Sequence, residues 1–298
     1  MPNDWNWCRG RRRLREQIFM ERTEHTTEAD IFDLRIGLDE QAISPEAKHF
    51  FDTAGYLIVK DLLTPNQIRQ AREVLGRLEG EQKEGPFGGE ILHIIEAGGV
   101  PEDAMALEAV LNPVRQFIWG QQYRLVGSRA LLRQAGVDSR LTQGGRADQR
   151  GYTRYRSFHN GQFRCLLITC LIALEDAVDG DGTFCVVPSS HKANLPHPYD
   201  NTQLDAVPPL IELPLRAGSG VLFTENLSHA FKTPRHHRHH WMSYQYGPSY
   251  MVNWPGCDPS ATLLERIGND PAKAHLLLPP YYHPEGAQKK KLENKESL

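Results

Sequence analysis

The sequence has few cysteines, and they form no pattern typical of a disulfide framework or a thiolate zinc site. The five are Cys8, Cys165, Cys170, Cys185 and Cys257, an odd number without any C-x-x-C pair. Cys165, Cys170 and Cys185 stand in apolar runs, where a free thiol behaves as a small hydrophobic side chain. We therefore expect a reduced, cytoplasmic protein.

Long apolar runs are also missing. No run approaches the roughly 18 residues that a membrane-spanning helix needs, and the first residues are charged rather than apolar, unlike a secretory signal. A strong net charge is absent too, because 34 basic and 37 acidic residues give −3. This balance provides no general attraction for nucleic acid. We therefore expect neither a membrane nor a nucleic acid as a partner.

The residues that are present predict a globular fold with helices first. The chain has 298 residues, 40% of them hydrophobic, which is enough for a large core. Residues 1–45 are charged and weakly periodic, and are interpreted as an extension. Ser44-Pro45 begins a helix, and Thr64-Pro65 begins another with its apolar residues on one face. A further helical stretch is expected over 101–119, interrupted at Asn112-Pro113.

From about residue 121 the pattern changes to short strands separated by Gly, Asn and Asp. Asn160-Gly161 predicts a tight hairpin between TRYRSF and QFRCLL, and Gly180 and Gly182 are interpreted as turn residues. Residues 121–250 should form two facing antiparallel sheets, with helices outside them. The fold class is therefore α+β, mainly β, with a sandwich or jelly-roll core. Residues 285–298 are interpreted as a disordered polar tail.

Several segments resemble the phytanoyl-CoA dioxygenase family. They are FFDTAGYLIVKDLLTPNQIRQAREVL (50–75), LIALEDAVDGDGTFCVVPSSHKANLPHP (171–198), GSGVLFTENLSHA (218–230) and LLLPPYY (276–282). The resemblance spans residues 46–284 as one domain and implies a cupin-like double-stranded β-helix of the jelly-roll type. It also implies Fe(II), 2-oxoglutarate as co-substrate, and hydroxylation of a small organic substrate.

The chemistry of such a site explains its residue types. Two imidazoles and one carboxylate occupy one face of the iron and leave positions open for 2-oxoglutarate and O₂. A cation, usually Arg, pairs with the far carboxylate of 2-oxoglutarate, which a planar guanidinium fork suits best. By resemblance His229, which follows the apolar strand GVLFT, is the distal metal ligand and should face the interior. His191 in PSSHK is interpreted as a turn residue rather than a ligand.

The residue at the first metal-ligand position differs from the family pattern. Where the family has a histidine, Gln143 precedes Gly144-Gly145, and an amide oxygen is a poor Fe(II) ligand beside imidazole. His159 is the alternative, although it falls in the predicted hairpin turn. Either Asp148 or Glu225 could supply the carboxylate, but Glu225 would lie about 13 Å from His229 on a fully extended strand.

The position of the residue that should bind 2-oxoglutarate also differs from the family pattern. When RHHRHH (235–240) is aligned with the family, His239 or His240 falls at the position of the arginine that binds 2-oxoglutarate. Arg238 would take this position only with a small shift in register. The paired histidines His236, His237, His239 and His240 are otherwise interpreted as a hydrated loop, with at least three facing solvent. Two functions remain open. One is an Fe(II)/2-oxoglutarate-dependent dioxygenase, and the other is a catalytically silent relative that binds a small molecule or partner in the same cavity.

Overall fold

The computed structural model describes most of the chain between residues 43 and 280. The ranges are 43–118, 123–136, 138–144, 155–157, 162–178, 180–193, 195, 197–200, 202–251, 258–268 and 270–280. The predicted extension, apart from its last three residues, and the predicted tail lie outside these ranges. So do His159, Asp148 and the turn Asn160-Gly161.

The first two helices in the described part of the chain begin where the sequence predicts. In α2 (Pro45–Ala54) the side chain of Ser44 accepts a hydrogen bond from the amide of Ala47. In α3 (Pro65–Leu78) Thr64 and Gln67 form a capping box, which satisfies two amide donors that the helix leaves open. Strand β1 (Tyr56–Val59) lies between these helices in the chain.

The second helical stretch differs from its prediction. It consists of α4 (Val100–Asp103), the 3-10 turn η4 (Ala104–Ala106) and α5 (Glu108–Phe117). The expected interruption at Asn112-Pro113 is wrong, because the break falls at the extended residue Leu107 and Pro113 lies inside α5. Residues on both sides of the proline are buried, so packing holds the helix together despite the hydrogen bond that proline removes.

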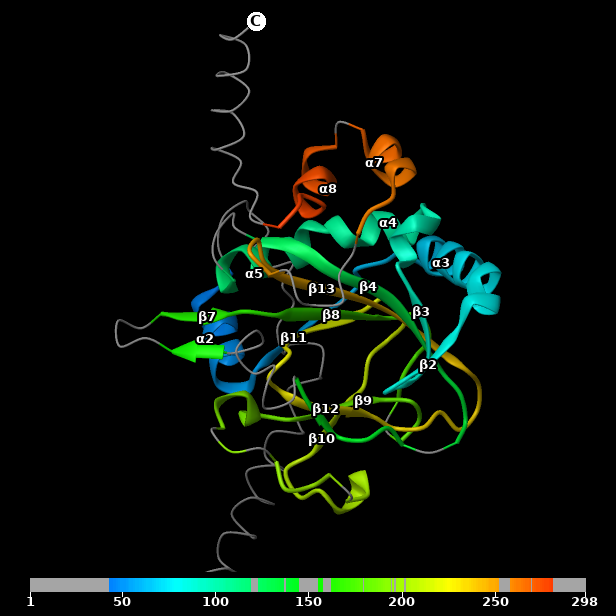
Figure 1. Cartoon of the computed structure of the whole chain (residues 1–298). Coiled ribbons are helices and arrows are strands. Elements are labelled where there is room, and N and C mark those ends of the chain that lie inside the picture. The colour runs from blue at the N-terminus through cyan, green and yellow to red at the C-terminus, as the bar shows by residue number, and fades with distance from the viewer. Residues whose placement is uncertain are drawn as a thin grey trace, which may run out of the picture. The chain divides into compact units, whose positions relative to one another are not determined.

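Seven strands form a large antiparallel sheet in the order β1-β11-β8-β13-β4-β3-β2. Besides β1 they are β2 (Lys83–Gly85), β3 (Gly88–Leu92), β4 (Tyr123–Arg133), β8 (Ile168–Ala173), β11 (Gly220–Thr224) and β13 (His239–Pro248). In Figure 1 the helices α3, α4 and α5 lie along this sheet. Tyr244 of β13 donates a hydrogen bond to the carbonyl of Pro101 in α4, so even-numbered residues in this part of β13 face the helices.

A smaller sheet has the order β10-β9-β12-β5. Its strands are β5 (Thr142–Gln143), β9 (Phe184–Val187), β10 (Ile211–Leu213) and β12 (Ser228–Phe231), and Figure 1 shows β9, β10 and β12 grouped apart from the large sheet. A separate hairpin pairs β6 (Tyr155–Ser157) with β7 (Phe163–Cys165). The predicted pairing around residues 158–162 is therefore confirmed.

The main core joins the two sheets. It combines buried side chains of the large sheet with those of the small one, among them Leu131, Leu171, Val221, Phe223, Trp241, Phe184, Val186, Leu213 and Phe231.

Gly180 and Gly182 both have positive φ, near +70°, as their predicted turn role requires. Cys165, Cys170 and Cys185 are free and buried, as expected. Two packed antiparallel sheets flanked by helices make the jelly-roll core that the sequence predicts.

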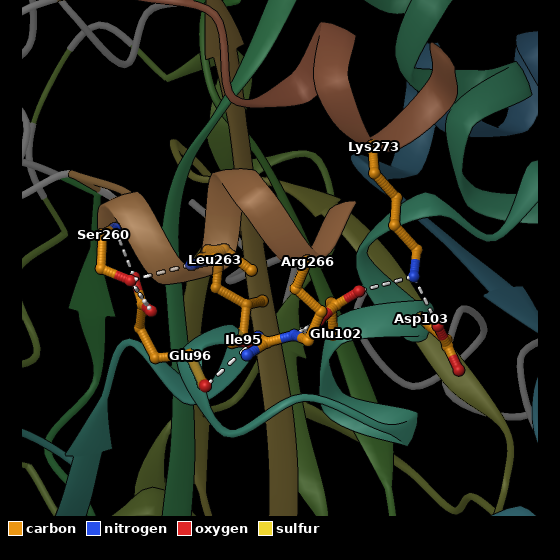
Figure 2. Close-up of polar contacts among 8 residues, drawn as sticks. All are labelled: Ile95, Glu96, Glu102, Asp103, Ser260, Leu263, Arg266 and Lys273. Carbon is orange, nitrogen blue, oxygen red and sulfur yellow. Dashed lines mark hydrogen bonds and ion pairs between the residues drawn. The ribbon is translucent and has the colours of Figure 1, made fainter. Parts of the chain in front are cut away.

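Two short helices near the end of the described chain attach to the segment before β4. Arg266 of α7 (Ala261–Ile267) and Lys273 of α8 (Pro271–Leu276) lie 2.6 and 2.8 Å from the carboxylate of Glu102. Figure 2 shows this cluster, in which Lys273 also reaches Asp103 at 2.6 Å. Burial works against the charge of Glu102, but the two cations lower its pKa. No helix in the described part of the chain is long and apolar enough to cross a membrane.

Candidate functional site

His229 faces the space between the two sheets, as predicted. Its side chain lies in β12 and is 2% exposed. The imidazole centroid is 4.8 Å from the ring of Phe223, 5.6 Å from Phe87 and 5.7 Å from Phe184. These aromatic side chains exclude water from the ring on several sides.

The hydrogen bonds of His229 define its tautomer. Nδ1 lies 2.7 Å from the carbonyl oxygen of Leu227, so Nδ1 carries the proton and donates it there. The lone pair then resides on Nε2, which lies 3.2 Å from Oγ1 of Thr142. Burial lowers the pKa of His229, which favours the neutral ring. A neutral imidazole whose second nitrogen is held by a backbone carbonyl has the form of a metal ligand.

The strand register puts Thr142, rather than Gln143, on the same face as His229. Thr142 pairs with His229 and Gln143 with Ser228, and successive strand residues point to opposite faces. The amide of Gln143 instead donates a hydrogen bond from Nε2 to the carbonyl of Ser190, at 3.1 Å. The prediction of Gln143 as the ligand position is therefore displaced by one residue. A shift of one residue reverses the face of a strand.

Glu225 lies near His229 because the chain turns between them. The amide of Leu227 donates a hydrogen bond to the carbonyl of Thr224 at 2.8 Å, and β11 and β12 belong to different sheets. The distance for an extended strand therefore does not apply. The carboxylate of Glu225 accepts a hydrogen bond from Thr169 at 2.6 Å. Its negative charge acts to raise the pKa of His229, against the effect of burial.

Gly144 leaves the volume that Glu225 fills. A Cβ atom at Gly144 would lie 2.5 Å from Cγ of Glu225, which is too close for real atoms. Gly144 follows Thr142 by two positions, so the chain passes from the contact with His229 to the contact with Glu225 within three residues.

The paired histidines differ from the expectation that at least three face solvent. His236 and His237 are exposed, but His239 is 1% exposed and His240 is half-buried. The expectation is wrong because β13 begins at His239 and alternation carries this side chain inward. Within the described residues, neither ring nitrogen of His239 has a hydrogen-bond partner.

Arg238 and His240 do not reach the interior. Arg238 lies 2.8 Å from the carboxylate of Glu79, and Nδ1 of His240 lies 3.1 Å from that of Glu175. His240 shares its face of β13 with Tyr244, which contacts α4. The prediction that either residue holds a co-substrate carboxylate next to His229 therefore disagrees with these contacts.

Two arginines on β4 face inward and were missed from the sequence. Arg129 and Arg133 flank the core residue Leu131 on the same face. The guanidinium of Arg129 lies 3.3 Å from Glu90. That of Arg133 donates to the carbonyl of Phe87 and lies 5.7 Å from the centroid of the Phe231 ring. Arg129 and Arg133 are four positions apart in a strand-like run, which indicates that they share one face of the strand. This spacing alone does not indicate whether that face points to the interior or to solvent.

A pocket opens beside this site. Its volume is about 690 Å³, and its lining includes Thr142, Arg133, Asp138, Arg140 and Gly88. Because Thr142 also contacts Nε2 of His229, this side chain stands between the pocket and the imidazole. The size suits a small organic molecule.

Strong metal donors near His229 are few in the described part of the chain. No group of three or more His, Cys, Asp or Glu residues that could hold a metal occurs among those residues. His229 and Glu225 supply one imidazole and one carboxylate, which fit a metal in residue type, and Thr142 adds a weak hydroxyl donor. His159 and Asp148, the other candidates from the sequence, lie outside the described residues.

Sequence comparison now identifies the family. The profile of the family described as phytanoyl-CoA dioxygenase (PhyH) matches residues 51–233. The chain belongs to the phytanoyl-CoA dioxygenase family. No curated protein matches it.

Solved structures support the same fold and cofactors. HygX from Streptomyces hygroscopicus, with nickel and 2-oxoglutarate bound, is 25% identical with a TM-score of 0.62, over 74% of this chain and 94% of that chain. HygX has also been solved with iron bound and with hygromycin B. The carbocyclase SnoK from nogalamycin biosynthesis is 16% identical, with a TM-score of 0.55, over 76% of this chain and 91% of that one. At that identity SnoK shows the fold alone. Iron and 2-oxoglutarate are thus bound by a structural relative within the family's fold.

Proposed function

We propose that this protein is an Fe(II)- and 2-oxoglutarate-dependent dioxygenase that hydroxylates a small organic substrate. One observation carries the proposal: His229 is buried as a neutral imidazole in its ligand tautomer, next to the carboxylate of Glu225. The binding of iron and 2-oxoglutarate by HygX supports it.

His229 and Glu225 are the two residues proposed to hold the metal. Leu227 holds the imidazole through Nδ1, and Thr169 holds one oxygen of Glu225 through a hydrogen bond of 2.6 Å. Such supporting bonds orient the ligands before a metal arrives. When bound, Fe(II) with 2-oxoglutarate activates O₂ for insertion of oxygen into a C–H bond, with succinate and CO₂ as co-products.

The rest of the site serves substrate binding and exclusion of water. Phe87, Phe184 and Phe223 surround the imidazole, which protects a reactive centre from solvent. The substrate is proposed to enter from the pocket beside Thr142. The presence of hygromycin B in a HygX structure supports a small molecule as the substrate class.

A catalytically silent relative is the second candidate. It is favoured by the finding that the described residues near His229 include only two strong metal donors. In this case the same interior would bind a small molecule without turnover.

Formation of succinate separates the two functions. Purified protein would be incubated with Fe(II), 2-oxoglutarate and air, and succinate would be measured over time. The dioxygenase produces succinate slowly even without its organic substrate, and Glu225→Gln reduces the rate at least about tenfold because a metal ligand is lost. Protein that binds Fe(II) and 2-oxoglutarate but forms no succinate above the metal-only blank would favour the silent relative.

A further inference from the structure

We propose that the substrate is an uncharged polyhydroxylated molecule with two linked rings, such as a disaccharide, and that Lys232 anchors the ring farther from His229. This inference rests on the proposed function and names its substrate class. It starts from a second pocket, of about 590 Å³, which adjoins the pocket beside Thr142. The two pockets share a common wall that includes Gly136, Asp138, Ser139 and Arg140.

The common wall is fixed to the chain that follows His229. The amide of Ser139 donates a hydrogen bond to the carbonyl of Phe231 at 2.9 Å, and the hydroxyl of Ser139 accepts one from the amide of Phe231 at 2.8 Å. The carboxylate of Asp138 accepts a hydrogen bond from the amide of Thr233 at 2.8 Å. Both pockets therefore have a defined position relative to β12, which carries His229.

Lys232 is the buried polar group of the second pocket. It lines this pocket although the residue is only 6% exposed. Its ammonium forms an ion pair with Asp205 and, at 3.5 Å, another with Asp138. Burial acts to lower the pKa of Lys232, but these carboxylates raise it overall, so the ammonium stays charged. Because an ammonium has three N–H donors and the two ion pairs use two, one donor is left for a ligand.

The charges that line the second pocket balance one another. Its described lining residues include three carboxylates and three cations, which are Asp138, Asp200, Asp205, Arg140, Lys232 and Arg235. An equal number of both signs gives no net attraction for a strongly charged ligand. The same groups still offer both hydrogen-bond donors and acceptors. A hydroxyl group donates and accepts, so a molecule rich in hydroxyls matches this lining.

A long acyl chain does not match the second pocket. Among the described lining residues Leu204 is the only one with a hydrocarbon side chain, and none is aromatic. An apolar ligand would take water from the charged groups and give no hydrogen bond in return. The first pocket has a mixed lining, in which Pro86 and Leu132 accompany polar residues. This mixture suits a sugar ring, which has C–H groups on its faces and hydroxyls at its edge.

The distance between the two anchors suits two rings. Lys232 follows His229 by three residues, which corresponds to about 10 Å along an extended strand. Two six-membered rings joined by one oxygen also span about 10 Å, given covalent bonds of about 1.5 Å. One ring then lies beside Thr142 and the other beside Lys232, with the common wall between them.

The test measures binding of defined probes to the full-length protein as purified, without added 2-oxoglutarate, by ligand-observed NMR and calorimetry. The disaccharides are maltose, lactose, sucrose and trehalose, and glucose is the single ring. Glucosamine and glucose 6-phosphate add a charge, and decanoate represents an acyl chain. At least one disaccharide should bind with a Kd of about 1 mM or tighter, and about tenfold or more tighter than every other probe.

Lys232→Met and Asp205→Asn should each weaken binding of that disaccharide by about fivefold or more, since each removes a charged hydrogen-bonding group from the second pocket. Glu73→Gln, at an exposed side chain of α3 outside both pockets, is the matched control and should leave the affinity unchanged. Circular dichroism checks folding. If Lys232→Met does not fold, Asp205→Asn decides, because the side chain of Asp205 is 87% exposed.

Two results overturn the inference. If no disaccharide binds, or if glucosamine, glucose 6-phosphate or decanoate binds more tightly, the substrate class is wrong. Unchanged disaccharide affinity in the folded variants of Lys232 and Asp205 overturns the placement of the second ring. Neither result affects the proposed function, because formation of succinate from 2-oxoglutarate tests that function separately.

Discussion

The side chain of Glu225 occupies the volume that a side chain at Gly144 would need. A Cβ atom at Gly144 would lie 2.5 Å from Cγ of Glu225 and 1.9 Å from its carbonyl oxygen. The amide of Gly144 also donates to that carbonyl at 2.7 Å. The carboxylate beside His229 therefore comes from the end of β11, and the glycine is what makes room for it.

Gly144→Ala should destabilise the protein by about 1–3 kcal/mol, because the new methyl group overlaps a backbone oxygen. The control is Gly76→Ala on the exposed side of α3, where a Cβ would meet nothing within 4 Å. That variant should be more stable by about 0.5–1 kcal/mol. Urea denaturation measures both, and equal stability of Gly144→Ala and the wild type would contradict the close approach.

Thr142→His should tighten Fe(II) binding by about tenfold or more, since it adds an imidazole on the face of His229. Gln143→His is the matched control, because this side chain points to Ser190 on the other face. Calorimetric titration under anaerobic conditions compares the two. A larger gain for Gln143→His would show that the strand register is shifted by one residue.

His191 gives the protein a defined pH dependence. Burial lowers its pKa to about 4, and Nε2 lies 3.0 Å from the carbonyl of Asp52 at the end of α2. This contact agrees with a structural role for the PSSHK histidine. Because the folded state disfavours the charged ring, its contribution to stability is complete above pH 6.5 and is lost as the pH falls toward 4.

The loss from His191 should be on the order of 3 kcal/mol across that window. His191→Gln should show a flatter decline in the free energy of unfolding between pH 6.5 and 4, measured by denaturant titration at several pH values. His236→Gln, at an exposed side chain, should keep the wild-type dependence. The same slope in His191→Gln and the wild type would contradict the low pKa.

The sequence predicts the fold well because its signals are local. The caps at Ser44 and Thr64, the turn glycines and the periodicity change after residue 121 each act within a few residues, and the jelly roll follows from them. Pro113 is the exception, because buried neighbours on both sides of it decide the helix. Packing of this kind is a tertiary effect that local patterns do not carry.

The site is predicted only in part, because strand faces and pairings decide it. His229 could be identified through the resemblance of the segment GSGVLFTENLSHA to the family. Thr142 and Gln143 are adjacent, and only their pairing with β12 shows which of them faces His229. Likewise, the pairing of His239 with Arg133 joins residues more than 100 positions apart. The turn at Thr224–Leu227, which brings Glu225 near His229, is equally invisible in a strand-like run.

We propose that His229 and Glu225 hold Fe(II) and that 2-oxoglutarate binds to this metal. Chelation of Fe(II) by 2-oxoglutarate produces a charge-transfer absorption band, which can be titrated anaerobically without turnover. The wild type should give a saturable band, and His229→Gln and Glu225→Gln should each lose most of it at the same metal concentration. The exposed-histidine variant His236→Gln/His237→Gln should retain it. A band of wild-type intensity in both His229→Gln and Glu225→Gln, or no band in the wild type, would contradict this account.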